Sequence, residues 1–123
     1  MKILFFSDVH WSTTSSIVRE RGIKYSIRLE RLIDSMSWVN QLAVDENCAM
    51  MICAGDMFDK PICTDEEITA IQEVKWNDLP CYFLCGNHES SVADLKYNSV
   101  NLLKKDNHII ITDPILLNVL PDL

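Results

Sequence analysis

The sequence predicts an α/β fold, with a mainly parallel sheet and flanking helices. Short apolar runs of strand length alternate with longer segments whose apolar residues recur at helical spacing. Three of the apolar runs end in clusters of polar residues, as strands do when they lead into a binding crevice. The alternation itself is typical of a parallel sheet with right-handed crossovers. A chain of 123 residues, 48% of them hydrophobic, fits one domain with a buried core.

The first predicted strand is Ile3–Phe6, and a polar stretch rich in Ser and Thr, residues 11–22, is expected to form a loop. A long helix is predicted from about Lys24 to Asn47. Charged residues such as Arg28 and Arg31 are expected largely on its solvent side. The apolar residues that recur at helical spacing on its other face are Leu29, Leu32, Ile33, Met36, Val39 and Ala43.

The second predicted strand covers residues 49–53. Thr64 is a good helix N-cap, and Glu67, three residues later, completes the pattern of a capping box. The helix that follows is expected to end near Trp76. Its inward-facing residues are Ile68, Ile71 and Val74.

The third predicted strand is Cys81–Leu84, directly after Pro80. A further helix is predicted over about residues 92–104, and Ile109–Ile111 is expected to form a fourth strand. Residues 115–120 are expected to begin a fifth. The chain contains no internal repeat, low-complexity tract or linker.

The composition limits the classes of partner and compartment. A net charge of −7 gives no general attraction to nucleic acid or to anionic membranes. No apolar run is long enough for a membrane span, and the apolar start is too short for a signal peptide. Five Cys without a C-x-x-C pair match no zinc pattern, so we expect reduced thiols in a cytoplasmic protein.

Three polar clusters follow the first three predicted strands: Asp8-Val9-His10, Gly55-Asp56-Met57-Phe58-Asp59 and Gly86-Asn87-His88-Glu89. The carboxyl ends of parallel strands meet at one edge of a sheet, so these clusters are expected to form one site. On extended chain, Asp8 and His10 would point the same way. Mixed carboxylate, amide and imidazole donors suit manganese, iron or zinc better than calcium.

Such a donor set predicts phosphoryl chemistry. Two divalent cations can bind a phosphoryl group and activate water for in-line attack. Asp56 could bridge the cations, and Asn87 offers a neutral carbonyl oxygen. His88 is expected to act as general acid or as a cation that stabilises the transition state. Asp59 could orient His88 by accepting its other ring N–H. Each cluster alone is also compatible with an ordinary turn or polar loop.

The three clusters together resemble the calcineurin-like metallophosphoesterase superfamily, whose first motifs are D-x-H, G-D-x-x-D and G-N-H-D/E in this order. The resemblance implies the first half of an αββα sandwich. It implies that Asp8, His10 and Asp56 bind one metal ion, and that Asp56 and Asn87 bind a second. It also assigns the family's catalytic pair to His88 and Asp59.

A narrower resemblance is to the SbcD-type nuclease subunit and its phage relatives, which share the forms S-D-x-H and G-D-x-F-D. It implies a DNA exo- or endonuclease that uses manganese and has an SbcC-like ABC-type ATPase as partner. Iron and zinc are the alternative metals. Glu89 replaces the Asp that is most common in these nucleases.

The later motifs of the superfamily, G-H and G-H-x-H, are absent, because the chain has only three His. His108, which precedes the fourth predicted strand without a Gly, is expected at the surface. The second metal site would keep only Asp56 and Asn87 and bind weakly. We therefore expect residues 1–123 to be an incomplete, amino-terminal part of the domain, with an uncovered apolar sheet face that favours homo-oligomers.

Two other functions fit the same motifs: a phosphatase or phosphodiesterase acting on a small molecule or protein, and a non-catalytic scaffold of the same fold. Trp11 could stack on a base, but packing over the site loop is the favoured interpretation. Five basic residues could contact phosphates near the site or simply form a solvated surface. They are Arg19, Arg21, Lys24, Arg28 and Arg31.

Overall fold

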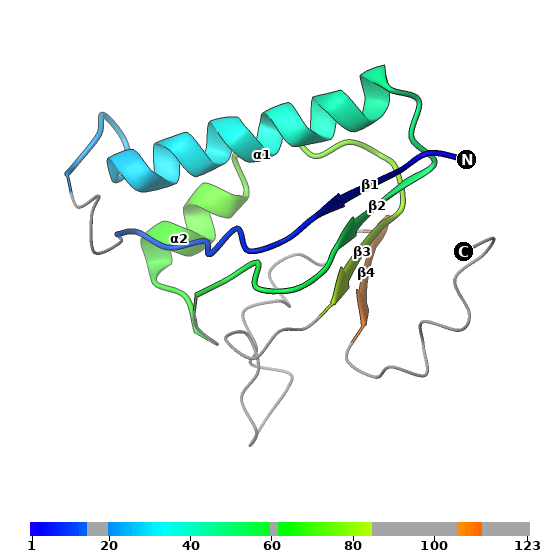
Figure 1. The fold of residues 1–123 in the computed structure, drawn as a ribbon. Helices are drawn as coiled ribbons and strands as arrows, with labels where there is room; N and C mark the ends of the chain where they lie inside the picture. Colours follow the sequence, from blue (N-terminus) through cyan, green and yellow to red (C-terminus); the bar gives the residue numbers. More distant parts are fainter. Residues whose placement is uncertain (15–19, 60–61, 85–105, 112–123) are drawn as a thin grey trace.

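The computed structural model describes residues 1–14, 20–59, 62–84 and 106–111. Four strands and two helices lie in these ranges, and they confirm the predicted α/β class (Figure 1). In chain order the elements are β1 (Ile3–Phe6), α1 (Ile27–Asp45), β2 (Met50–Cys53), α2 (Asp65–Ile71), β3 (Cys81–Leu84) and β4 (His108–Ile111).

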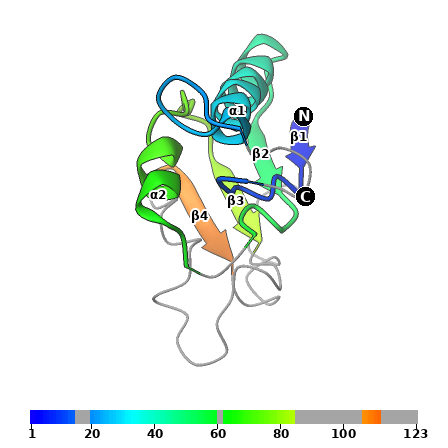
Figure 2. The ribbon, with the colours of Figure 1, turned by 90° about the vertical axis from the view of Figure 1, so that its left-hand side faces the viewer.

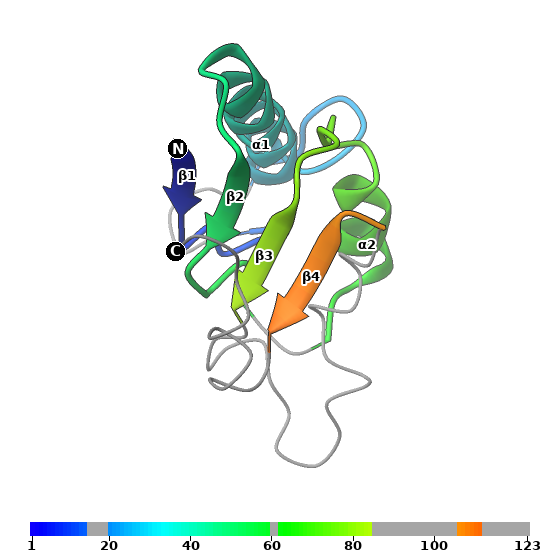
Figure 3. The ribbon, with the colours of Figure 1, turned by 90° about the vertical axis from the view of Figure 1, so that its right-hand side faces the viewer.

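The four strands form one parallel sheet in the order β1-β2-β3-β4 (Figure 3). The register places Phe6 beside Cys53, and Cys53 beside Phe83, so the carboxyl ends of the first three strands lie together. Both helices lie on the same side of the sheet (Figure 2). This is the expected result when consecutive neighbouring strands are joined by crossovers of one hand.

The main core fills the space between the sheet and the two helices. Side chains alternate across each strand, so Leu4, Phe6, Met51, Cys53 and Phe83 face this core. The opposite face is also apolar, as expected for a parallel sheet. Its buried residues are Met50, Ile52, Tyr82 and Ile111. Phe5, on the same face, is 64% exposed.

Helix α1 begins at Ile27 rather than at Lys24, because Ser26 is its N-cap. The Ser26 hydroxyl accepts a hydrogen bond from the backbone N–H of Leu29 at 3.1 Å. The predicted apolar face is buried or partly buried against the core. Asn40, which periodicity does not single out, is 2% exposed and accepts a hydrogen bond from the Asn77 backbone N–H at 3.0 Å.

Helix α2 has the predicted capping box between Thr64 and Glu67. It ends at Ile71, however, and not near Trp76. Beyond Ile71 the chain turns, so that the Trp76 ring packs edge-on against Phe83, with 6.1 Å between the ring centroids. The tertiary contact of this aromatic ring replaces the last expected turn of helix.

The prediction that His108 lies at the surface is wrong. His108 is 7% exposed and begins β4, one residue before the predicted strand start. Its ring packs edge-on against Trp76 and Phe83, with centroid distances of 4.8 and 5.2 Å. Because β4 is parallel to the other strands, His108 lies at their amino ends, away from the polar clusters.

Two predicted elements, the helix over 92–104 and the strand over 115–120, lie outside the described residues. Within the described part of the chain, no helix is long and apolar enough to cross a membrane.

Candidate metal centre

The candidate site lies on two loops that continue side by side from β1 and β2 (Figure 1). The backbone N–H of Asp8 donates to Gly55 O at 3.1 Å, and the N–H of His10 donates to Asp56 O at 3.0 Å. The N–H of Trp11 then donates to Met57 O at 2.8 Å. These bonds fix the first and second polar clusters against each other.

The backbone of this site is not extended, and the period-two argument for Asp8 and His10 is therefore wrong. Strand β1 ends at Phe6. Asp8, His10 and Asp56 have φ angles of 57°, 52° and 54°, in the left-handed region that non-glycine residues seldom adopt. Such conformations cost free energy and persist only when surrounding contacts hold them.

The side chains of Asp8, His10 and Asp56 nevertheless converge. One ligand atom from each lies within 4.8 Å of the others. His10 Nε2 lies 3.7 Å from Asp8 Oδ1. Two carboxylates and one imidazole form a donor set that fits a divalent metal of the manganese, iron or zinc type. The geometry thus brings together the three residues that were predicted for the first metal ion.

Asp59 lies beside this cluster. Its Oδ1 is 2.7 Å from Nδ1 of His10. A carboxylate that accepts the Nδ1–H of a histidine leaves Nε2 with its lone pair free to bind a metal. In the described residues Asp59 therefore orients His10. The predicted partner His88, like the predicted ligand Asn87, lies outside these residues, and both roles stay predictions.

The environment of Asp8 favours its charged form. The Ser7 hydroxyl donates a hydrogen bond to Asp8 Oδ2 at 2.8 Å and lowers the pKa of this carboxyl group. The nearby His10 lowers the pKa of Asp8 further. An anionic carboxylate is the form that binds a cation.

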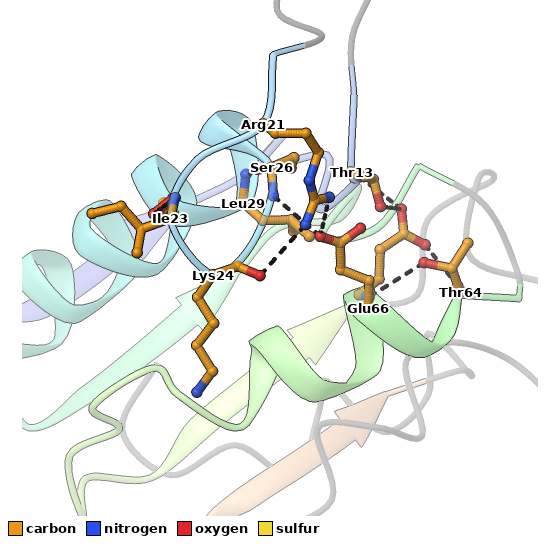
Figure 4. Close-up of polar contacts among 10 residues, drawn as sticks. Thr13, Arg21, Ile23, Lys24, Ser26, Leu29, Thr64 and Glu66 are labelled. Atoms are coloured by element: carbon orange, nitrogen blue, oxygen red, sulfur yellow. Dashed lines mark hydrogen bonds and ion pairs between the residues drawn. The ribbon is translucent and has the colours of Figure 1, made fainter.

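The residues just after His10 are held by α2. Trp11 is fully buried, and its indole N–H donates to Glu67 O at 3.0 Å. The buried Glu67 carboxylate accepts the backbone N–H of Thr13 at 2.8 Å through Oε2, and that of Thr64 at 2.8 Å through Oε1. Figure 4 shows Thr13 and Thr64 close to each other at the start of α2. The capping box identified Glu67 from the sequence, but its bond to Thr13 carried no sequence signal.

Two features that suggested nucleic-acid binding have other roles in the structure. Trp11 is buried, which confirms packing and leaves no face for a base. Arg21 pairs with Glu66 of α2 (Figure 4). Lys24 pairs with Glu73, in the turn after α2, so the charges of both basic residues are offset by acids. Arg21 and Lys24 therefore do not contribute unpaired positive charge to a basic surface.

A polar cavity of about 630 Å³ opens next to Asp59. It is lined by hydroxyl side chains, including Thr13 and Thr64, and by acidic side chains, including Asp65 and Glu66. Among the described residues that line the cavity, none is basic. Such a lining suits a neutral polar or cationic group of a ligand better than a phosphate group.

The comparison with known families agrees with this geometry. The family model for calcineurin-like phosphoesterases matches residues 1–120 of the chain. No curated protein matches the sequence.

Proposed function

Because the chain belongs to the calcineurin-like phosphoesterase family, we propose that it hydrolyses phosphoesters with divalent metal ions held by Asp8, His10 and Asp56. The observation that carries the proposal is the convergence of these three side chains within 4.8 Å. When bound, the metal ions would act as Lewis acids toward the phosphoryl oxygens and would lower the pKa of water. Asn87 is the proposed additional ligand of a second, weaker ion.

The protein groups would prepare this chemistry in three ways. Asp8 and Asp56 supply negative charge for the cations. Asp59 fixes the tautomer of His10 through the 2.7 Å contact to Nδ1. His88 is the proposed proton donor to the leaving oxygen, from the position that it has in the family's motif.

For the substrate, we propose a phosphodiester of DNA. The support is the form of the first two clusters, S-D-x-H and G-D-x-F-D, which are similar to those of SbcD-type nucleases. Manganese is the proposed metal, and an ABC-type ATPase and a second copy of the chain are the proposed partners. Trp11 is buried, and Arg21 and Lys24 are ion-paired, so these three residues no longer support DNA binding as the sequence had suggested.

A second substrate class, a phosphoester of a small molecule or protein, is favoured by the acidic cavity beside Asp59. Carboxylates in that position would repel the phosphates that flank a DNA cleavage site. A neutral or cationic leaving group would meet no such repulsion.

The test is manganese-dependent hydrolysis by the wild-type chain and its Asp56→Asn variant. Asp34→Asn, at an exposed position on α1, is the matched control. Three substrates separate the candidates: an end-labelled DNA duplex, bis-p-nitrophenyl phosphate and p-nitrophenyl phosphate. Cleavage of the duplex that is lost only in Asp56→Asn supports the nuclease proposal. Loss of monoester hydrolysis alone supports the second class.

Absence of all three activities, with unchanged Mn²⁺ binding by calorimetry in Asp56→Asn, would contradict the proposal and favour a scaffold. The calorimetry matters because it measures the metal site independently of turnover.

A further inference from the structure

Arg28 has a contact that neither the family motifs nor a solvated helix face requires. It lies near the start of α1, 18 residues along the chain from His10, and is only partly exposed. One terminal guanidinium nitrogen donates to the backbone carbonyl of His10 at 2.9 Å. Its Nε donates to the Ser12 hydroxyl at 3.0 Å. The expected solvent-facing role of Arg28 is therefore wrong.

Ser12 completes a closed set of hydrogen bonds. Its side chain is buried, and its hydroxyl donates to the same His10 carbonyl at 2.9 Å. The carbonyl thus accepts two hydrogen bonds, one of them from a charged donor. Charge-assisted bonds are stronger and more directional than neutral ones. The fork of the guanidinium fixes Ser12 and the His10 carbonyl in one arrangement.

The position of Arg28 is unfavourable for the helix itself. It is the second residue after the N-cap Ser26, where the helix dipole favours acidic side chains over basic ones. A residue that opposes its local environment is expected where it serves a site. Here the favourable contact is made with a distant part of the chain, the backbone of His10, whose φ is 52°.

We infer that Arg28 is a positioning residue for the metal centre, which holds His10 in its left-handed conformation so that the imidazole faces Asp8 and Asp56. This inference rests on the proposed function. The His10 ring is fixed from one side by Asp59 and its backbone from the other side by Arg28. Without Arg28, His10 would relax toward ordinary backbone angles, and its ring would leave the position that the other two donors define.

The experiment compares wild type with Arg28→Lys, which keeps the charge and the aliphatic stem but loses the fork. Arg31→Lys, an exposed position one turn further along α1, is the matched control. Ser12→Ala is a second variant that leaves Arg28 in place. Two quantities are measured: the Kd for Mn²⁺ by calorimetry, and the carbonyl ¹³C shift of His10 in the metal-free protein.

We expect Arg28→Lys to weaken Mn²⁺ binding by about 10–100-fold, the range for residues that orient metal ligands. The His10 carbonyl shift should move in Arg28→Lys and Ser12→Ala but not in Arg31→Lys. A global loss of structure would instead move shifts throughout the sheet. Wild-type affinity in Arg28→Lys would overturn the inference and leave the proposed function standing.

Failure of the proposed function has a different signature, since wild type and Asp56→Asn would then bind Mn²⁺ equally. In that case the role of Arg28 in a metal centre is overturned as well. The metal-free shift then shows only whether Arg28 holds the His10 backbone: a response to Arg28→Lys confined to His10 and its neighbours means that it does, and no response means that it does not.

Discussion

Substitution of Glu67 by Gln tests how the site loop is attached to α2. Glu67 is 1% exposed, and its carboxylate accepts at least three hydrogen bonds within the described part of the chain. Two come from Thr13, from the backbone N–H at 2.8 Å and from the hydroxyl at 3.2 Å. The third comes from the Thr64 backbone N–H at 2.8 Å. Gln keeps the shape of the side chain but has only one acceptor oxygen.

The magnitude follows from the donors that lose their partner. In Glu67→Gln the amide NH₂ must face either the Thr13 or the Thr64 backbone N–H, so one partly buried donor is left unsatisfied. Such a loss costs about 1–3 kcal/mol. In Glu67→Ala both backbone donors lose their partner, and the expected cost is about 2–6 kcal/mol from the same range counted twice.

The assay is urea unfolding followed by tryptophan fluorescence. Asp65→Asn is the control, because it removes an exposed charge from the same helix turn without touching Thr13. The free energy of unfolding should fall by about 1–3 kcal/mol in Glu67→Gln and by less than about 0.5 kcal/mol in Asp65→Asn. Equal values for wild type and Glu67→Gln would refute the argument that this carboxylate joins the site loop to α2.

Three further predictions concern stability. Ser26→Ala removes the N-cap of α1 and should cost about 0.5–2 kcal/mol in thermal unfolding, whereas an unchanged melting temperature would rule out the cap. Phe83→Ala should cost about 3–5 kcal/mol in urea unfolding, while Ile23→Ala, at a fully exposed position, should change stability by less than about 0.5 kcal/mol. Burial, and secondarily the nearby Cys53, raises the pKa of the Cys81 thiol above the ordinary value of about 8.5, so the folded state keeps this proton where the unfolded state loses it. The resulting stability is present below about pH 8.5 and is lost as the pH rises. The free energy of unfolding, measured from pH 7 to 11, should therefore fall less steeply with pH in Cys81→Ala than in wild type. Equal slopes for the two proteins would contradict this.

Local sequence patterns were sufficient for most of the described secondary structure. Strands Ile3–Phe6 and Cys81–Leu84 were predicted with their observed bounds, because each is a short apolar run; Lys2 and Ser7 limit the first, and Pro80 precedes the second. The capping box of α2 depends on two residues three positions apart, and it formed as predicted. The ends of the helices were less certain, since Ser26 and Trp76 act through contacts that periodicity does not measure.

The side chains of Asp8, His10 and Asp56 lie together as the sequence predicted, but part of the reason given for it was wrong. The order of the polar clusters and the parallel topology suffice to bring Asp8, His10 and Asp56 to one edge of the sheet. The extended conformation assumed for Asp8 and His10 does not occur. Bonds between the two loops, together with the contact of Arg28 with the His10 carbonyl, accompany a left-handed backbone there, and no pattern in either loop alone specifies it.

The sequence by itself determined three things: the α/β class, the order in which the polar clusters follow the strands, and the residues that are candidate metal donors. These depend on composition and on spacing within a few residues. The tertiary structure decided that Trp11 and His108 are buried, and that Arg28 and Asp59 both hold His10. The reason is physical: these contacts join residues far apart in the chain, and their free energy depends on which surfaces the folded sheet and helices bring together.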